Sequence, residues 1–189
     1  MTTQTLVVVL VVVVIAVVTV AAWWYAQQRR RSEHLRDQFG PEYDRALREH
    51  GGRGPAEAAL QEREERVQQL RIRPLAAADR TRFAGTWRSV QARFVDDPEG
   101  AIGEADRVVQ EVMQARGYPM GDFEQRAADI SVDHPQEVEH YRAAHAIAQR
   151  QARGEATTED LRQAMVHYRA LFEDLLEAEA QNVEEVRRG

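Results

Sequence analysis

The sequence predicts an all-α protein: a single N-terminal transmembrane helix, then a helical hairpin and a small helical bundle. Three observations lead to this fold class. A long apolar run opens the chain, apolar residues then recur at steps of three and four, and no segment alternates apolar and polar residues over strand length. We expect a transmembrane anchor over residues 1–26, a juxtamembrane hairpin over 27–74, a bundle over 75–180 and a polar tail over 181–189.

The apolar run extends from Leu6 to Ala22 and is interrupted only by Thr19. With the aromatic residues that follow, it reaches the roughly 20 residues that a hydrocarbon core of about 30 Å requires at about 1.5 Å per residue. Valine dominates the run, but a lone segment in lipid must satisfy every backbone group internally, so we expect a helix. The sequence thus predicts one membrane span.

Aromatic and basic residues follow this run and mark one membrane face. Indole and phenol rings favour the headgroup level, and arginine-rich flanks stay on the cytoplasmic side. We therefore expect a single-pass protein of the cell membrane, with the N-terminus outside, the C-terminal domain in the cytoplasm and the lipid bilayer as a partner. The expected membrane-interface residues are Trp23, Trp24, Tyr25, Arg29, Arg30 and Arg31.

A cleaved signal peptide is the alternative for the same segment, and it would make the rest of the chain an exported domain. Val20 and Ala22 are acceptable residues at a cleavage site, but a signal peptide carries its positive charge before the apolar region. Here the stretch from Met1 to Thr5 has no basic side chain, and the arginines follow the apolar run. This order of charges favours an anchor.

Two helices are expected between the arginines and Pro74. The segment Ser32–His50 places apolar residues at steps of three or four, with a kink or break at Pro41. The segment Ala56–Ile72 carries a narrow apolar stripe among charged residues, and a glycine-rich turn separates the two. Together they predict an antiparallel helical hairpin near the membrane.

The bundle begins after Pro74 with a helix whose aromatic residues share one face. Asp97 and Pro98 then suit the cap and first position of another helix, which Gly117 ends. A short helix is expected from Asp122 to Ile130, and another begins after Pro135. Helical spacing indicates that the aromatic set belongs to the core and lines no ligand pocket: Phe83, Trp87, Phe94, Phe123 and Phe172.

The last helix has the most regular apolar pattern, and Thr157 or Thr158 is its expected cap. Its apolar residues repeat at steps of four, three, four and three: Leu161, Met165, Tyr168, Phe172 and Leu175. Such a repeat is typical of helix-against-helix association. We therefore expect the segment Thr158–Ala180 to dock a protein partner or a second copy of the chain.

Composition excludes several classes of function. The formal net charge is -6 and the pI is about 5.6, so we expect no nucleic-acid partner. The chain has no cysteine, which excludes disulfides, thiolate catalysis and cysteine-ligated zinc. It also has no lysine, which excludes the phosphate-binding Gly-x-x-x-x-Gly-Lys loop and indicates a GC-rich bacterial source. We expect no enzymatic activity, because no catalytic motif is present.

We also expect no metal or cofactor, although four residues are weak candidates for metal ligands. Glu137 and His140 form a Glu-x-x-His unit on one helix face, but carboxylate-bridged metal sites in bundles require a second copy, which is absent. His145 and His167 lie at the edges of apolar stripes, where a histidine titrates near neutral pH or binds metal, and more often is simply hydrogen-bonded. These four residues remain the candidates.

Three segments carry a resemblance to a known group. They are Trp87–Pro98 (WRSVQARFVDDP), Ala115–Pro119 (ARGYP) and Phe123–Ala146 (FEQRAADISVDHPQEVEHYRAAHA). The chain resembles a group of uncharacterised bacterial proteins with a short N-terminal membrane anchor and a helical body. The resemblance covers most of residues 27–176, and it implies no activity and no site residues.

The architecture favours a membrane-tethered helical interaction or scaffold module. The alternative is a small metal- or ligand-binding helical protein at the membrane, centred on Glu137, His140, His145 and His167.

Overall fold

A computed structural model describes the backbone of residues 3–188, and side chains are described from residue 10 to residue 177 except at 11 and 14. Over this part the chain forms eight helices and no strand, which confirms the all-α fold class. The chain divides into two compact units, Met1–Gln38 and Phe39–Gly189. The domain boundaries expected from the sequence stay predictions.

The first helix, α1 (Thr3–Phe39), continues without a break from the apolar run through the arginines. The described large apolar side chains between Leu10 and Tyr25 are all more than half exposed. Because they occupy nearly consecutive positions, they project on all sides of the helix. Over this stretch α1 therefore lacks the polar face that an ordinary surface helix presents to water.

The membrane span predicted for this helix is not supported. Among the residues with described side chains, no helix offers a stretch long and apolar enough to cross a bilayer. The predicted span begins at Leu6, and the side chains of residues 6–9, 11 and 14 lie outside the described part. The uninterrupted run from Ile15 to Tyr25 covers only roughly 16 Å at about 1.5 Å per residue, about half of a hydrocarbon core.

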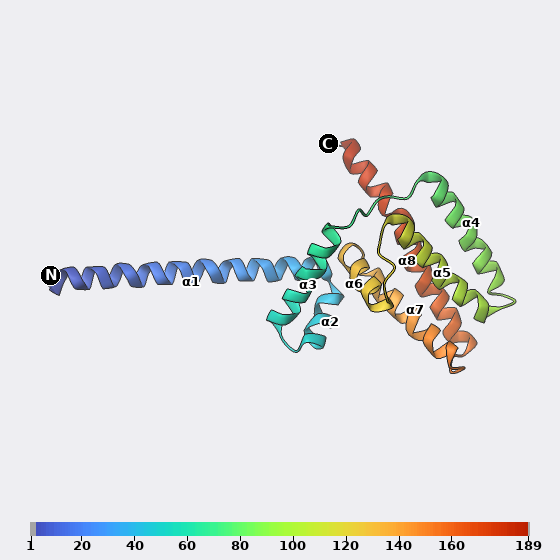
Figure 1. The fold of residues 1–189 in the computed structure, drawn as a ribbon, viewed down its shortest axis with the longest axis horizontal. Helices are drawn as coiled ribbons and strands as arrows, with labels where there is room; N and C mark the ends of the chain where they lie inside the picture. The colour runs from blue at the N-terminus through green and yellow to red at the C-terminus, as the bar shows by residue number, and fades with distance from the viewer. Residues whose placement is uncertain (1–2, 189) are drawn as a thin grey trace. The chain divides into compact units, whose positions relative to one another are not determined.

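A glycine separates α1 from α2 (Pro41–His50). Gly40 has a φ of 46°, in the left-handed region that favours glycine, and Pro41 takes the first position of the new helix. The break predicted at Pro41 is thereby confirmed. The next helix, α3 (Arg53–Gln68), follows after a two-glycine turn and packs against α2 (Figure 1).

The end of α3 differs from the prediction. The sequence predicts a helix that reaches Ile72, but α3 ends at Gln68. Beyond this point the chain leaves the helix and runs to α4, and the Arg73 N–H donates to the Arg116 carbonyl oxygen at 2.8 Å. This tertiary hydrogen bond uses a backbone donor that a longer α3 would direct into its own helix.

Helices α4 (Ala77–Arg93) and α5 (Pro98–Arg116) follow, and α5 has the ends that the sequence predicts. The Asp97 carboxylate accepts a hydrogen bond from the Gly100 N–H at 3.0 Å, and Pro98 opens the helix. Gly117 ends it with a φ of 103°. The cap, the first position and the end of α5 are all confirmed.

Three helices complete the second unit: α6 (Phe123–Asp133), α7 (Glu137–Ala152) and α8 (Thr158–Arg188). α6 extends past the predicted end at Ile130, because the first residue that Pro135 disfavours in a helix is His134. Thr157 is the cap of α8, where its Oγ1 accepts from the Asp160 N–H at 3.2 Å.

The main core lies among α4, α5, α6, α7 and α8. In the second unit α8 packs against both α5 and α7, and α6 contacts α3 and α7 (Figure 1). The rings of Trp87 and Phe172 stack with centroids 4.5 Å apart. The aromatic set predicted for the core is confirmed there: Phe83, Trp87 and Phe172 are buried, and Phe94 and Phe123 pack against the core half-buried.

The apolar repeat on which the docking surface of the last helix was predicted is not exposed, and docking itself stays a prediction. All five residues of the apolar repeat are buried in the core of the same chain: Leu161, Met165, Tyr168, Phe172 and Leu175. The repeat packs α8 against α5 and α7, so it offers no free apolar face. The remainder of the predicted surface, residues 178–180, lies outside the described side chains.

Candidate functional site

Two of the four candidate ligands meet on the contact between α7 and α8. The Nδ1 atoms of His140 and His167 lie 2.9 Å apart, and the ring centroids are 5.2 Å apart. His140 is exposed and His167 is half-buried. Burial, followed by the nearby His140, lowers the pKa of His167. The pair therefore presents imidazole nitrogens at the surface, with His167 favoured in its neutral form.

His145 does not join this pair. It lies five positions after His140, which turns it by about 140° around α7. Its ring stacks on Phe123 with centroids 3.6 Å apart, and its Nε2 lies 3.0 Å from the Gln149 amide nitrogen. Burial lowers the pKa of His145. It is a packed histidine at the edge of the core, which is the ordinary role that the sequence left open for it.

Glu137 belongs to a different cluster, one that the sequence analysis missed. Ligand-type atoms of His134, Glu137 and Asp174 all lie within 4.8 Å of one another. His134 comes from the turn between α6 and α7, and Asp174 from α8. Asp174 lies 40 positions from His134, so no local spacing in the sequence could have revealed the cluster.

The chemistry of His134 favours a hydrogen-bonded connection over a metal site. The Arg116 guanidinium, which donates only, lies 3.3 Å from His134 Nε2, so this nitrogen accepts. The hydrogen of the neutral ring then sits on Nδ1, which contacts Asp174. A metal on Nδ1 would need the lone pair that this proton occupies. Arg116 also donates to the Leu175 carbonyl at 3.2 Å, so the group ties α5 to α8.

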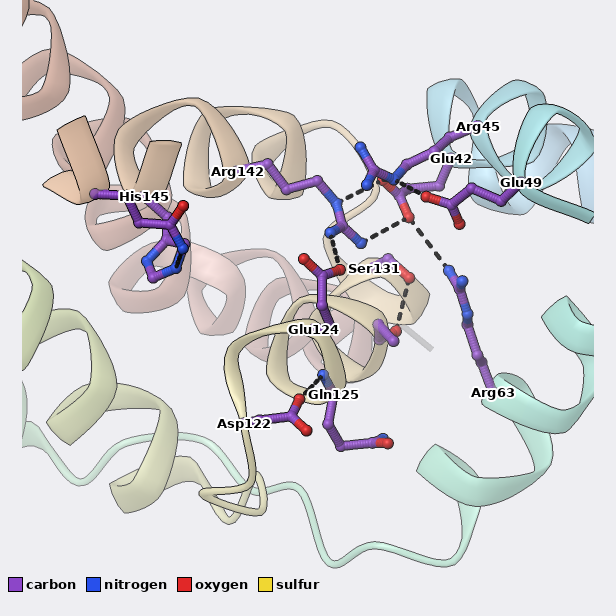
Figure 2. A network of polar contacts seen from close by, with 12 residues as sticks. Glu42, Arg45, Glu49, Arg63, Asp122, Glu124, Gln125, Ser131, Arg142 and His145 are labelled. Carbon is purple, nitrogen blue, oxygen red and sulfur yellow. Dashed lines mark hydrogen bonds and ion pairs between the residues drawn. The ribbon is translucent and has the colours of Figure 1, made fainter. Parts of the chain in front are cut away.

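A second polar cluster surrounds the buried carboxylate of Glu42 (Figure 2). Arg142 on α7 donates to both of its oxygens, at 3.1 and 3.3 Å, and Arg63 on α3 donates at 3.2 Å. Burial opposes the charge of Arg142, but Glu42 and then Glu124 outweigh this and raise its pKa. The cluster joins α2, α3 and α7 and has the features of a structural ion pair.

The predicted membrane-interface residues lie in the second half of α1. Trp23, Trp24 and Tyr25 are exposed by 68%, 65% and 70%. The arginines Arg29, Arg30 and Arg31 are also exposed, and Arg29 pairs with Glu33 at 2.9 Å.

No family model, no curated protein and no solved structure matches this chain. The comparisons therefore identify no family, and the established class is that of an all-helical protein, with eight helices in the described residues.

Proposed function

We propose that the chain is a membrane-tethered helical module that holds its second unit at a bilayer surface as a scaffold for protein interaction. The observation that carries the proposal is the exposure of every described large apolar side chain between Leu10 and Tyr25. An apolar helix without a polar face is stable where lipid or protein covers it. In water this apolar surface would stay exposed to solvent, which is unfavourable.

The residues after the apolar stretch fit the same arrangement. Trp23, Trp24 and Tyr25 would place amphipathic rings at the headgroup level. Arg29, Arg30 and Arg31 follow within two turns, and each arginine near anionic lipid contributes on the order of 1 kcal/mol. The second unit would then lie on the cytoplasmic side of a single-pass protein.

The second unit has the stable interior that a scaffold requires. Its core draws on five helices, α4 to α8, and buried ion pairs join α2 and α3 to α7. Because the apolar repeat of α8 lies in that core, a partner would have to bind polar and charged helix surfaces. We also propose, on the segments Trp87–Pro98 and Phe123–Ala146, a relationship to membrane-anchored helical proteins of bacteria.

A labelling experiment tests the proposed topology. The chain has no cysteine, so Gly189→Cys introduces a single thiol at the C-terminus. We expect a membrane-impermeant maleimide to label it in lysed cells and not in intact cells, with the protein in the membrane fraction. A matched Thr2→Cys variant should already be labelled in intact cells. Labelling of Gly189→Cys in intact cells would instead place the domain outside, as in an exported protein.

A further inference from the structure

We propose that His140 and His167 form a binding site for a divalent transition-metal ion of the copper or nickel class, which links α7 to α8. Their Nδ1 atoms lie 2.9 Å apart on neighbouring helices. Between two neutral rings at this distance, one nitrogen donates its hydrogen and the other accepts it. When a metal ion binds, the donor ring changes tautomer: its Nδ1 proton is exchanged through solvent for one on Nε2, so both rings stay neutral and both Nδ1 lone pairs bind the ion.

The nitrogen separation is compatible with Cu²⁺ and Ni²⁺, and the general order of metal affinities favours the same ions. At metal–nitrogen distances of about 2.0–2.1 Å, a separation of 2.9 Å corresponds to an angle of about 90° at the metal. This is the angle between neighbouring ligands in the tetragonal geometry typical of Cu²⁺ and Ni²⁺. A tetrahedral zinc ion would hold the two nitrogens about 3.3 Å apart. Among divalent ions, nitrogen sites bind Cu²⁺ most strongly.

The surroundings allow an ion to enter and to complete its coordination. His140 is exposed, so solvent reaches the pair and water can fill the remaining positions. Glu137 precedes His140 by three residues and therefore lies on the same face of α7. Its carboxylate lies in the cluster with His134 and Asp174, so water is the expected ligand at the remaining positions. Each imidazole ring would have to turn, because an ion about 2.0–2.1 Å from both nitrogens lies about 45° off the line that joins them, and χ2 of histidine has a broad minimum that allows this.

The protonation of the pair also suits a metal ligand. Burial and the neighbouring His140 lower the pKa of His167. A neutral imidazole offers the lone pair that a metal requires, and protons compete less for it near neutral pH. His134 differs from the pair, because both of its ring nitrogens already contact other side chains, Arg116 and Asp174.

Titration of the full chain with Cu²⁺ tests the site. The protein is purified in detergent without an affinity tag and treated with chelator, and binding is followed by calorimetry and electron paramagnetic resonance. We expect one strongly bound Cu²⁺ per chain, with a signal from two coordinating nitrogens. His140→Gln and His167→Gln should each weaken this binding at least tenfold. His50→Gln, at an exposed position on α2, should leave it unchanged.

A second measurement covers the case in which a variant folds poorly. Because the ion binds only the folded arrangement of α7 and α8, Cu²⁺ should raise the unfolding temperature of the wild-type protein by about 5 °C or more at saturation. His140→Gln should lose this increase while it keeps a helical circular dichroism spectrum. The proposal is overturned if wild-type protein binds no stoichiometric Cu²⁺, or if His140→Gln binds it as tightly as His50→Gln does.

Discussion

Arg142 and Glu42, which lie 100 positions apart in the sequence, meet in the interior, where the Arg142 Nε donates to Glu42 Oε1 at 3.1 Å. The Glu42 side chain is fully buried and that of Arg142 is 10% exposed. The pair joins the hairpin of α2 and α3 to α7, and Arg63 adds a second cation to the same carboxylate. A buried carboxylate therefore connects three helices that are far apart in the sequence of the second unit.

Removing this carboxylate should destabilise the fold strongly. We expect Glu42→Ala to lower the free energy of unfolding by about 3–5 kcal/mol, because Arg63 and Arg142 lose the buried carboxylate that they share and Arg142 keeps only the exposed Glu124. Adding Arg142→Leu should recover a large part of this loss. Glu49→Ala on the same helix, in an exposed pair with Arg45, should cost less than about 1 kcal/mol. Equal costs for both single changes, measured by chemical denaturation, would contradict the buried ion pair.

The stacked rings of Trp87 and Phe172 should contribute much of the core stability. Phe172→Ala should cost about 3–5 kcal/mol, because it removes a buried aromatic ring and leaves a cavity between α4 and α8. Phe172→Leu should cost clearly less. Urea denaturation monitored by far-ultraviolet circular dichroism gives both values. A cost below about 1 kcal/mol for the alanine variant would show that this pair is not packed as described.

Two glycines of the α5 region should respond to alanine in opposite directions. At Gly117, with a φ of 103°, a Cβ would lie 2.7 Å from the Arg71 carbonyl oxygen, so Gly117→Ala should cost at least about 1–3 kcal/mol. Gly103 is exposed within α5, and a Cβ added there would meet nothing within 4 Å, so Gly103→Ala should stabilise by about 0.5–1 kcal/mol. Thermal unfolding of both variants compares them directly.

The two histidines with lowered pKa values make stability depend on pH. Burial lowers the pKa of His145 and of His167, so the unfolded chain takes up protons at a higher pH than the folded one. Their contribution is present above the unfolded pKa of about 6.5 and is lost as pH falls below it. The urea concentration at the midpoint of denaturation should therefore decrease when the pH is lowered from about 7.5 to about 5.5.

His145→Gln should flatten this pH dependence, by at most about 1.4 kcal/mol per pH unit for a single group. His50→Gln, at an exposed histidine, is the matched control. A stability that rises as pH falls through this window would contradict the lowered pKa values of these two half-buried histidines.

The sequence predicted those features that depend on residues close to one another along the chain. The cap Asp97, the initial Pro98 and the terminal Gly117 of α5 act locally, so all were found. The end of α3 depends on a hydrogen bond between Arg73 and Arg116, and no local pattern reveals it.

At the candidate site, too, the sequence identified single residues but not the contacts that the fold creates between them. His140 and His167 were identified singly, but their contact depends on the register of α7 against α8. The cluster of His134, Asp174 and Arg116 was missed because its members come from segments that are far apart in the sequence. The apolar repeat of α8 was recognised correctly, but the sequence alone does not say whether the core or a partner covers it.

Flotation of the full chain with lipid vesicles shows whether α1 holds the chain at a bilayer, as proposed. We expect the wild-type protein to float with the vesicles and to stay with them in alkaline carbonate. A variant with Val13→Asp and Val17→Asp, which places two charges within the exposed apolar stretch, should lose this retention. Wild-type protein that stays at the bottom of the gradient in the presence of vesicles would contradict the claim.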